Sequence, residues 1–174
     1  MFLSINNKIN LTLCGMMGSG KSSIGKILAK KINYSFYDID KLIEKKTNKS
    51  IISIFKDEGE KYFRMLEESV TLDILNKKNS IISLGGGAIT NKHIRDSIQK
   101  NSFNIYLKVN LNILKKRLQK SKSRPLLIEN NLNNTLAFLI DKREKYYNKA
   151  DLIIDNELNI TRTTENILNK IINE

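Results

Sequence analysis

The 174-residue chain contains little of several residue types that mark particular protein classes: one cysteine, one proline, eight glycines and no tryptophan. One cysteine cannot form an internal disulfide framework, and so little proline and glycine excludes collagen-like and low-complexity chains. Hydrophobic residues make up 40% of the chain, which is the composition of a folded protein rather than a disordered one. We expect one domain over residues 1–174, because this length leaves little room for a second core.

Long apolar segments are also missing from the sequence. No apolar stretch approaches the ~20 residues that span a bilayer. The first residues have neither the basic n-region nor the long apolar segment of a signal peptide. We therefore expect a cytoplasmic protein with no membrane partner, and we expect it to be a monomer.

The charge is unbalanced, with 30 Lys and Arg against 18 Asp and Glu, for a net charge of +12. Such an excess favours an anionic partner or substrate. Lysines scattered among many Asn and Ile residues are also what AT-rich coding DNA produces, so both explanations stay open. The aromatic residues, 7% of the chain, do not interleave with the basic ones as in a single-strand stacking platform. No nucleic-acid partner is expected.

Strand and helix patterns alternate along the chain. Short apolar segments with the character of strands cover residues 9–14, 34–37, 80–84, 103–107 and 151–155. Apolar residues recur at helical spacing after each of them, with interruptions near Asn48 and Gly59. This pattern predicts an α/β fold with a five-stranded, mostly parallel sheet and helices on both faces. Ligands of such sheets bind at the carboxyl ends of the strands.

The first strand leads into a glycine-rich motif that satisfies G-x-x-x-x-G-K-[ST] between a strand and a helix. Backbone N–H groups of such a loop point at phosphate oxygens. Lys21 reaches the β- and γ-phosphates, and the Ser22 hydroxyl is a ligand for Mg²⁺. The sequence therefore predicts a nucleoside triphosphate site. Its expected residues are Gly15, Met16, Met17, Gly18, Ser19, Gly20, Lys21, Ser22 and Ser23.

A P-loop alone does not separate kinases from GTPases, motors and ATP-driven nucleic-acid enzymes. The chain has no Asn-Lys-x-Asp guanine signature and no room for a second motor domain, so its length favours a small-molecule kinase. Asp38 and Asp40 end the second strand, where alternation would turn one carboxylate toward the P-loop and the other toward an acceptor. Asp38 would then hold Mg²⁺ and Asp40 would orient a substrate hydroxyl. Alternatively, either residue only caps the helix that begins near Lys41.

Two further features are open to a structural and a functional interpretation. Arg64 lies four residues after Glu60 and three before Glu67, so that both can pair with it on a helix, either as a surface ion-pair ladder or as part of a site. The glycines 85–87 follow a strand, where they would let a ligand approach backbone N–H groups closely. The combination of the two features favours a ligand site over a surface ion-pair ladder alone.

These motifs, in this order and spacing, resemble the shikimate kinase family. The matching segments are the P-loop, Asp38 to Glu44, Phe55 to Glu67, Ser83 to Gly87 and Arg124 to Leu127. The resemblance implies a P-loop kinase three-layer sandwich, related to nucleoside monophosphate kinases, with a mobile lid. It also implies ATP-dependent phosphorylation of the 3-hydroxyl of shikimate, a step of aromatic amino-acid (chorismate) biosynthesis. ATP and shikimate are then the substrates, with one Mg²⁺ per subunit.

The resemblance also implies roles for individual residues. Lys21, Asp40 and Arg124 are the expected catalytic residues, and Ser22 and Asp38 the expected metal ligands. Arg117 is expected to pack on adenine, and Arg124 to reach the phosphates from a lid at about 121–134. The expected shikimate-binding residues are Asp40, Phe55, Phe63, Arg64, Gly85, Gly86, Gly87 and Arg143, with Glu67 orienting Arg64.

Two segments depart from the family. Where it often has Arg-x-Pro-Leu-Tyr, this chain has Arg143-Glu-Lys-Tyr-Tyr147. Residues 155–159 lack the Arg and Pro often found beside adenine, so that contact stays unassigned. The alternatives are another small P-loop kinase, acting on gluconate or a nucleoside monophosphate, and an ATP-dependent nucleic-acid-binding protein.

Overall fold

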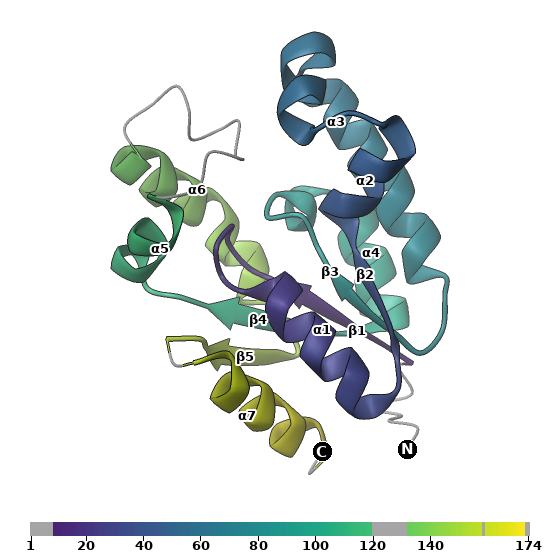
Figure 1. Cartoon of the computed structure of the whole chain (residues 1–174), viewed down its shortest axis with the longest axis vertical. Coiled ribbons are helices and arrows are strands. Elements are labelled where there is room, and N and C mark those ends of the chain that lie inside the picture. The colour runs from purple at the N-terminus through teal and green to yellow at the C-terminus, as the bar shows by residue number, and fades with distance from the viewer. Residues whose placement is uncertain (1–8, 120–131, 158, 173–174) are drawn as a thin grey trace.

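The computed structural model describes residues 9–119, 132–157 and 159–172. In this part of the chain five strands form one sheet in the order β2-β3-β1-β4-β5, and every pairing is parallel (Figure 1). The predicted α/β fold is therefore confirmed. The strands are β1 (Asn10–Cys14), β2 (Ser35–Asp38), β3 (Ser80–Ser83), β4 (Ser102–Lys108) and β5 (Leu152–Asp155).

The strand β1 lies at the centre of the sheet. Its Leu13 pairs with Ser83 of β3 on one side and with Ile105 of β4 on the other. The chain builds β2 and β3 on one side of β1 before it crosses to β4 and β5. The strand order thus switches at β1, and in open α/β sheets the crevice at such a point is where ligands bind. Because the P-loop follows β1 directly, it lies at this switch point.

Helices cover both faces of the sheet (Figure 1). The helices α1 and α7 share one buried cluster with Leu11 and Leu13 of β1. Cys14 points to the opposite face, where it joins the cluster to which α2 through α6 contribute. The helices are α1 (Lys21–Ile32), α2 (Ile39–Thr47), α3 (Ile51–Leu75), α4 (Lys92–Asn101), α5 (Leu111–Leu118), α6 (Leu132–Tyr147) and α7 (Ile160–Ile172), with a 3-10 helix η1 (Ala88–Thr90). Within the described ranges, none of the helices has the length and apolarity needed to cross a membrane.

The helical segment after β2 is interrupted at the two predicted places. The helix α2 ends at Asn48, which is left-handed with φ 51°, a conformation that asparagine tolerates at helix ends. The helix α3 is kinked at Gly59, where φ is 81° and ψ is 169°. Residues on both sides of this kink line one pocket, described below.

One expectation drawn from the sequence is wrong in its boundary. The strand β2 ends at Asp38, so Asp40 lies in the first turn of α2 and strand alternation does not set its direction. The reason is the cap: the Asp38 carboxylate accepts from the backbone N of Lys41 at 3.3 Å and starts the helix at once. The predicted lid at 121–134 lies mostly outside the described residues, and its last residues, 132–134, belong to α6. Residues 132–134 begin a helix although their segment is polar. The first N–H groups of a helix have no partner within the helix, so polar residues are compatible with its first turn.

Candidate active site

The P-loop connects β1 to α1, and its glycines shape it. Gly15 has a φ of 137° and Gly20, which precedes α1, has a φ of 90°, both in the region that side chains disfavour. A Cβ on Gly15 would lie 2.7 Å from the carbonyl oxygen of Leu107 on β4. The loop therefore packs tightly against β4 and ends at a helix N-terminus, where the helix dipole favours an anion.

Lys21 is held inside this loop and is only 8% exposed. Its Nζ donates hydrogen bonds to the carbonyl oxygens of Gly15, at 2.8 Å, and Met16, at 2.9 Å. Lys21 also lines a cavity together with Ser22 and other P-loop residues. The ammonium group is thus fixed beside the space in which the loop can bind phosphate.

Two carboxylates line the P-loop cavity together with the loop itself. Its wall includes Asp38 from the end of β2, Asp40 from α2 and Ser83 from β3. The Ser22 hydroxyl oxygen lies 3.5 Å from that of Ser83. Asp38 caps α2 and also lines the P-loop cavity, so the two interpretations that the sequence left open are compatible.

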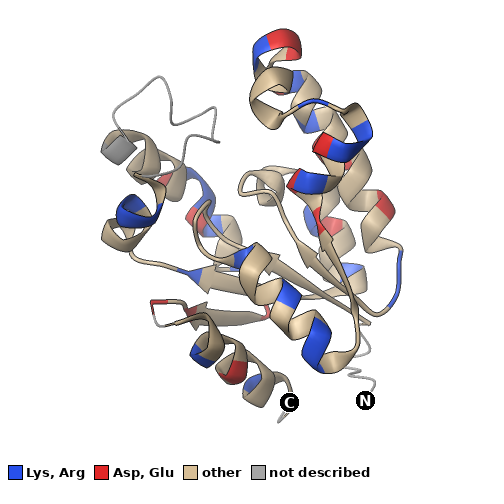
Figure 2. Cartoon of the chain, in the orientation of Figure 1, with Lys and Arg blue, Asp and Glu red and all other residues tan. Residues whose placement is uncertain are grey.

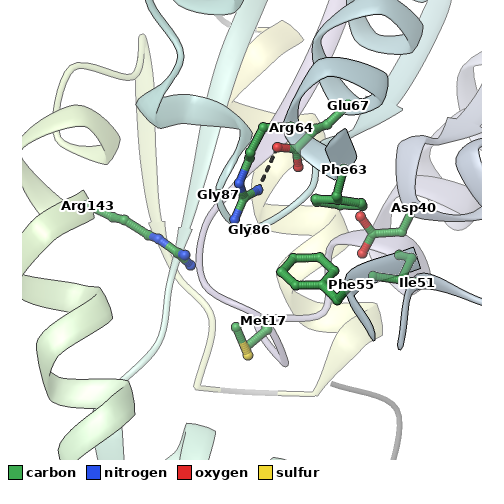
Figure 3. Close-up of a pocket in the computed structure, with 10 residues that line it drawn as sticks. All are labelled: Met17, Asp40, Ile51, Phe55, Phe63, Arg64, Glu67, Gly86, Gly87 and Arg143. Atoms are coloured by element: carbon green, nitrogen blue, oxygen red, sulfur yellow. Dashed lines mark hydrogen bonds and ion pairs between the residues drawn. The ribbon is translucent and has the colours of Figure 1, made fainter. Parts of the chain in front are cut away.

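A second cavity, which we call the acceptor pocket, adjoins the P-loop cavity (Figure 3). Met17, Asp40 and Gly86 line both cavities, so the two adjoin at these residues. The acceptor pocket is lined by Met17, Asp40, Ile51, Phe55, Phe63, Arg64, Glu67, Gly86, Gly87 and Arg143.

One wall of the acceptor pocket is apolar. Phe55 and Phe63 lie on either side of the α3 kink, and their ring centroids are 4.8 Å apart at an angle of 42°. Ile51 and Met17 extend this wall. Such a surface fits the carbon skeleton of a small ring and leaves its polar groups to the rest of the pocket.

Arg64 is held on α3 by the two glutamates that flank it. Its Nη1 donates to Glu67 at 2.6 Å, while Nε and Nη2 donate to Glu60 at 3.1 and 2.9 Å. Burial opposes the charge of Arg64, but Glu67 and Glu60 outweigh burial and raise the pKa of the guanidinium. Burial also opposes the charge of Glu67, which is 2% exposed. It therefore raises the pKa of that carboxyl group, although Arg64 opposes the shift. The ion-pair ladder and the functional interpretation are therefore compatible, since the ladder orients a cation that lines the pocket.

Arg143 brings a second cation to the acceptor pocket from α6. Its side chain extends toward the glycine loop and Arg64 (Figure 3). The residue is 5% exposed, and its Nη1 has no hydrogen-bond partner among the described residues. Burial is the main reason that the pKa of Arg143 is lowered, and the nearby Arg64 adds to it. A carboxylate bound in the pocket would accept a hydrogen bond from this Nη1 and would place a negative charge beside the guanidinium.

The glycine triplet forms the floor between these two arginines. None of the three glycines has a positive φ, so they are required for space rather than for backbone conformation. A Cβ on Gly85 would collide with the Glu67 carboxylate, and one on Gly87 would lie 2.6 Å from Nη1 of Arg64. Gly85 is the one predicted substrate-binding residue that does not line the pocket, and it supports Glu67 from behind.

We expect Gly85→Ala to lower the free energy of unfolding by about 1–3 kcal/mol, the usual cost of overpacking. The added methyl group must displace Glu67, so the acceptor should bind more weakly as well. Thermal and urea unfolding measure the first effect. Gly86→Ala is the matched control, because its Cβ would come no closer than 3.4 Å to other atoms. Equal losses of stability in both variants would contradict the packing argument.

Arg117 and Asn156 brace the outer side of the P-loop. Arg117 donates to the carbonyl oxygens of Gly18 and Asn156, both at 3.2 Å. The Asn156 amide donates to the carbonyl oxygen of Ser19 at 2.6 Å and accepts from the hydroxyl of Thr163 on α7 at 2.8 Å. Arg117 is thus close to the P-loop, as an adenine contact requires, whereas Arg124 lies outside the described residues.

Sequence reasoning did not find all of these residues. Asn156 lies in the segment for which no contact was assigned, and no motif marks it. Ile51 and Ser83 were not predicted either, although Ser83 stands directly before the glycine loop. Tyr147 was seen only as a neighbour of Arg143, while its hydrogen bond to Gly86 is visible only in the structure.

A P-loop at the switch point of a parallel sheet, next to a separate small pocket with two arginines and an aspartate in its lining, is the arrangement expected of a P-loop kinase. Comparison with known proteins identifies the family. A family model described as shikimate kinase matches residues 17–174. The chain belongs to the shikimate kinase family, which makes it an ATP-using phosphotransferase, and the resemblance seen in the motifs is confirmed.

Individual relatives agree with this assignment. The chain is 43% identical to a shikimate kinase of Rippkaea orientalis over 94% of this chain and 86% of the relative. It is 39% identical to that of Bartonella quintana, over 99% and 86%. A solved shikimate kinase from Acinetobacter baumannii, in complex with shikimate, superimposes with a TM-score of 0.93 at 31% identity, covering 98% of this chain and 96% of that one. A gluconokinase from Sinorhizobium meliloti reaches a TM-score of 0.67 at 14% identity, over 94% of this chain and 91% of that one, and shares the fold alone.

Proposed function

We propose that the acceptor pocket binds shikimate and that the P-loop presents ATP to it, so that the γ-phosphoryl group passes to the 3-hydroxyl. The product is shikimate 3-phosphate, a step of aromatic amino-acid biosynthesis. The observation that carries this proposal is the pair Arg64 and Arg143, which face one small pocket from two helices while the buried Nη1 of Arg143 lacks a partner. A carboxylate bound there would leave the rest of a ring directed toward Asp40, beside the P-loop.

The position of each group supports the catalytic role that we propose for it. Asp40 lines both cavities, so its carboxylate can accept a hydrogen bond from the acceptor hydroxyl and orient it toward the phosphate. Lys21 lies on the phosphate side, where its charge can stabilise the transferring group. We assign Phe55 and Phe63 to the ring and the glycine triplet to the polar substituents. Arg117 is assigned to the nucleotide, as is Arg124.

The residues around Ser22 fit one Mg²⁺ ion. The Ser22 hydroxyl and the Asp38 carboxylate are hard oxygen donors in one cavity, the donor type that Mg²⁺ prefers. Among the described residues no group of three or more His, Cys, Asp or Glu side chains could hold a metal. Mg²⁺ is commonly held by one or two protein oxygens together with nucleotide phosphates. When bound, Mg²⁺ neutralises negative charge on those phosphates.

A coupled assay of ADP release tests the proposed function. The purified chain would be supplied with ATP and Mg²⁺ and offered shikimate, gluconate or nucleoside monophosphates one at a time. We expect ADP release with shikimate, and mass spectrometry of the product should show one added phosphoryl group. Turnover with gluconate or a nucleotide, and none with shikimate, would replace this proposal with one of the alternatives.

We expect Arg143→Lys to weaken shikimate binding by about 1–3 kcal/mol, because an ammonium cannot make the paired hydrogen bonds of a planar guanidinium. The affinity for ATP should be nearly unchanged. Calorimetric titration with each ligand measures both effects. Arg162→Lys, an exposed substitution on α7, is the control and should bind both ligands like the wild type. Equal weakening for both ligands in Arg143→Lys would count against the assignment.

Three expectations concern the whole protein and stay predictions: one domain over residues 1–174, a monomer, and a cytoplasmic enzyme with no nucleic-acid partner. Size-exclusion chromatography with light scattering measures the oligomeric state. A titration with DNA and RNA at several salt concentrations tests whether the net charge of +12 serves nucleic-acid binding.

A further inference from the structure

Tyr147 is buried between the acceptor pocket and the core, at the end of α6. Its side chain is 1% exposed, and its ring stacks on Tyr106 with centroids 4.9 Å apart and an angle of 19°. The hydroxyl group donates to the carbonyl oxygen of Gly86 at 2.5 Å and lies 3.8 Å from the sulfur of Met16. Tyr147 does not line the acceptor pocket, so it reaches the glycine loop from the core side.

The hydrogen bond from Tyr147 determines which way the Gly86–Gly87 peptide faces. In a planar trans peptide the C=O and N–H bonds point in opposite directions, and the described residues contain no cis peptide bond. Because the Gly86 oxygen points to the core, the N–H of Gly87 points to the other side, where both glycines line the acceptor pocket. A peptide between two glycines turns over at little steric cost, so this orientation needs a partner.

The neighbouring carbonyl groups of the loop are held by local bonds instead. The Gly85 oxygen accepts from the N–H of Ala88 at 3.1 Å. The Gly87 oxygen accepts from the N–H of Thr90 at 3.0 Å and from its hydroxyl at 2.8 Å. Both partners belong to η1, directly after the loop. The Gly86 carbonyl is held by Tyr147, a residue 61 positions away in the sequence.

The same hydroxyl is linked to Arg143, one helical turn earlier on α6. The two groups are close enough for each to affect the pKa of the other. Burial, the largest effect, raises the pKa of Tyr147 far above its ordinary value, with Arg143 opposing. The phenol therefore stays protonated at neutral pH and can accept from the guanidinium while it donates to Gly86. One hydroxyl thus connects the cation of the pocket with the orientation of its floor.

We propose that Tyr147 is a positioning residue for the acceptor: its hydroxyl turns the N–H of Gly87 into the pocket and steadies Arg143 beside it. The inference rests on the proposed function, since the acceptor is taken to be shikimate. It adds that α6 contributes two side chains to the site. The guanidinium of Arg143 contacts the substrate, and the phenol of Tyr147 orients a backbone donor without touching the substrate.

The substitution Tyr147→Phe tests this inference because it removes one oxygen and keeps the ring that stacks on Tyr106. We expect the KM for shikimate to rise about tenfold, which corresponds to the loss of about 1.4 kcal/mol of binding free energy. The KM for ATP should stay within about twofold of wild type, which corresponds to a change of only about 0.4 kcal/mol in binding free energy. Tyr106→Phe is the matched control, since it removes the hydroxyl from the other ring of the stack, and it should leave both KM values unchanged.

A second measurement follows the backbone donor itself. In protein labelled with ¹⁵N-glycine, shikimate should shift the Gly87 amide resonance of the wild type and of Tyr106→Phe. In Tyr147→Phe the shift should be much smaller. An unchanged KM for shikimate together with a wild-type Gly87 shift would overturn the positioning role, and so would equal increases in both KM values, which indicate general loosening. A wild-type chain that neither binds nor turns over shikimate would overturn the proposed function itself, and this inference with it.

Discussion

Lys21→Ala is expected to lower kcat by at least about 10²-fold, the scale on which single groups that stabilise transition-state charge contribute. The reason is the position of Nζ, which two carbonyl groups of the P-loop hold beside the phosphate-binding cavity. An alanine leaves the backbone N–H groups of the loop in place, so ATP should still bind, although more weakly. The loss should therefore be larger in kcat than in nucleotide affinity.

The measurement is steady-state ADP release at saturating shikimate, with nucleotide affinity from calorimetry. Lys26→Ala, an exposed lysine on the same helix, should retain wild-type activity. Circular dichroism must show that Lys21→Ala is folded, since the substitution also removes hydrogen bonds of Nζ, among them those to Gly15 and Met16, worth about 0.5–1.5 kcal/mol each. A folded Lys21→Ala variant with more than about a tenth of wild-type turnover would contradict the role assigned to this lysine, since it would lose less than a factor of ten, or about 1.4 kcal/mol.

The sheet and the phosphate site could be predicted because their signals are local in the sequence. The strands are short apolar segments, and the P-loop is eight consecutive residues between a strand and a helix. Asn48 and Gly59 were placed at interruptions because left-handed backbone angles select these residue types. In each case the physical cause acts over a few residues, so that reading neighbours in the sequence is enough.

Other parts of the site depend on contacts between distant segments. Glycine at position 85 is required by the carboxylate of Glu67 on another element, and neither residue alone indicates the other. Asn156 bonds to Ser19 across 137 positions, and Tyr147 bonds to Gly86 across 61. Such pairs exist only once the sheet has brought its strands together. Family resemblance can identify such a residue from a motif, but the physical reason that the position requires it lies in the packing of distant segments.

Asp40 lines the acceptor pocket, but the sequence pattern gave the wrong reason for its direction. Side chains two residues apart on a strand point to the same face, so alternation could not have separated Asp38 from Asp40. Asp40 instead lies on α2 and owes its direction to the helix that begins after the cap at Asp38. The helix begins at Ile39, and its first turn carries the Asp40 carboxylate to the place where the two cavities meet. The role predicted for Asp40 therefore depends on the helix start, a boundary of one or two residues that sequence patterns define poorly.

Asp40→Asn is expected to lower kcat by about 10²-fold or more, the usual contribution of a positioned acid or base. Asparagine keeps the size of the side chain, but its neutral amide cannot draw a proton from the acceptor hydroxyl as a carboxylate does. The KM for ATP should change little, because the nucleotide is assigned to the P-loop. Rates with saturating substrates, measured from pH 6 to 9, separate the chemical step from binding.

Two variants make this result specific to Asp40. Asp73→Asn, an exposed aspartate on α3, should behave like the wild type. Asp38→Asn should raise the Mg²⁺ concentration needed for half-maximal activity, because that carboxylate faces the P-loop cavity and not the acceptor pocket. If Asp40→Asn changed the Mg²⁺ requirement while Asp38→Asn lost the catalytic rate, the two carboxylates would have exchanged roles. The hydroxyl would then be oriented from the end of β2 rather than from the first turn of α2.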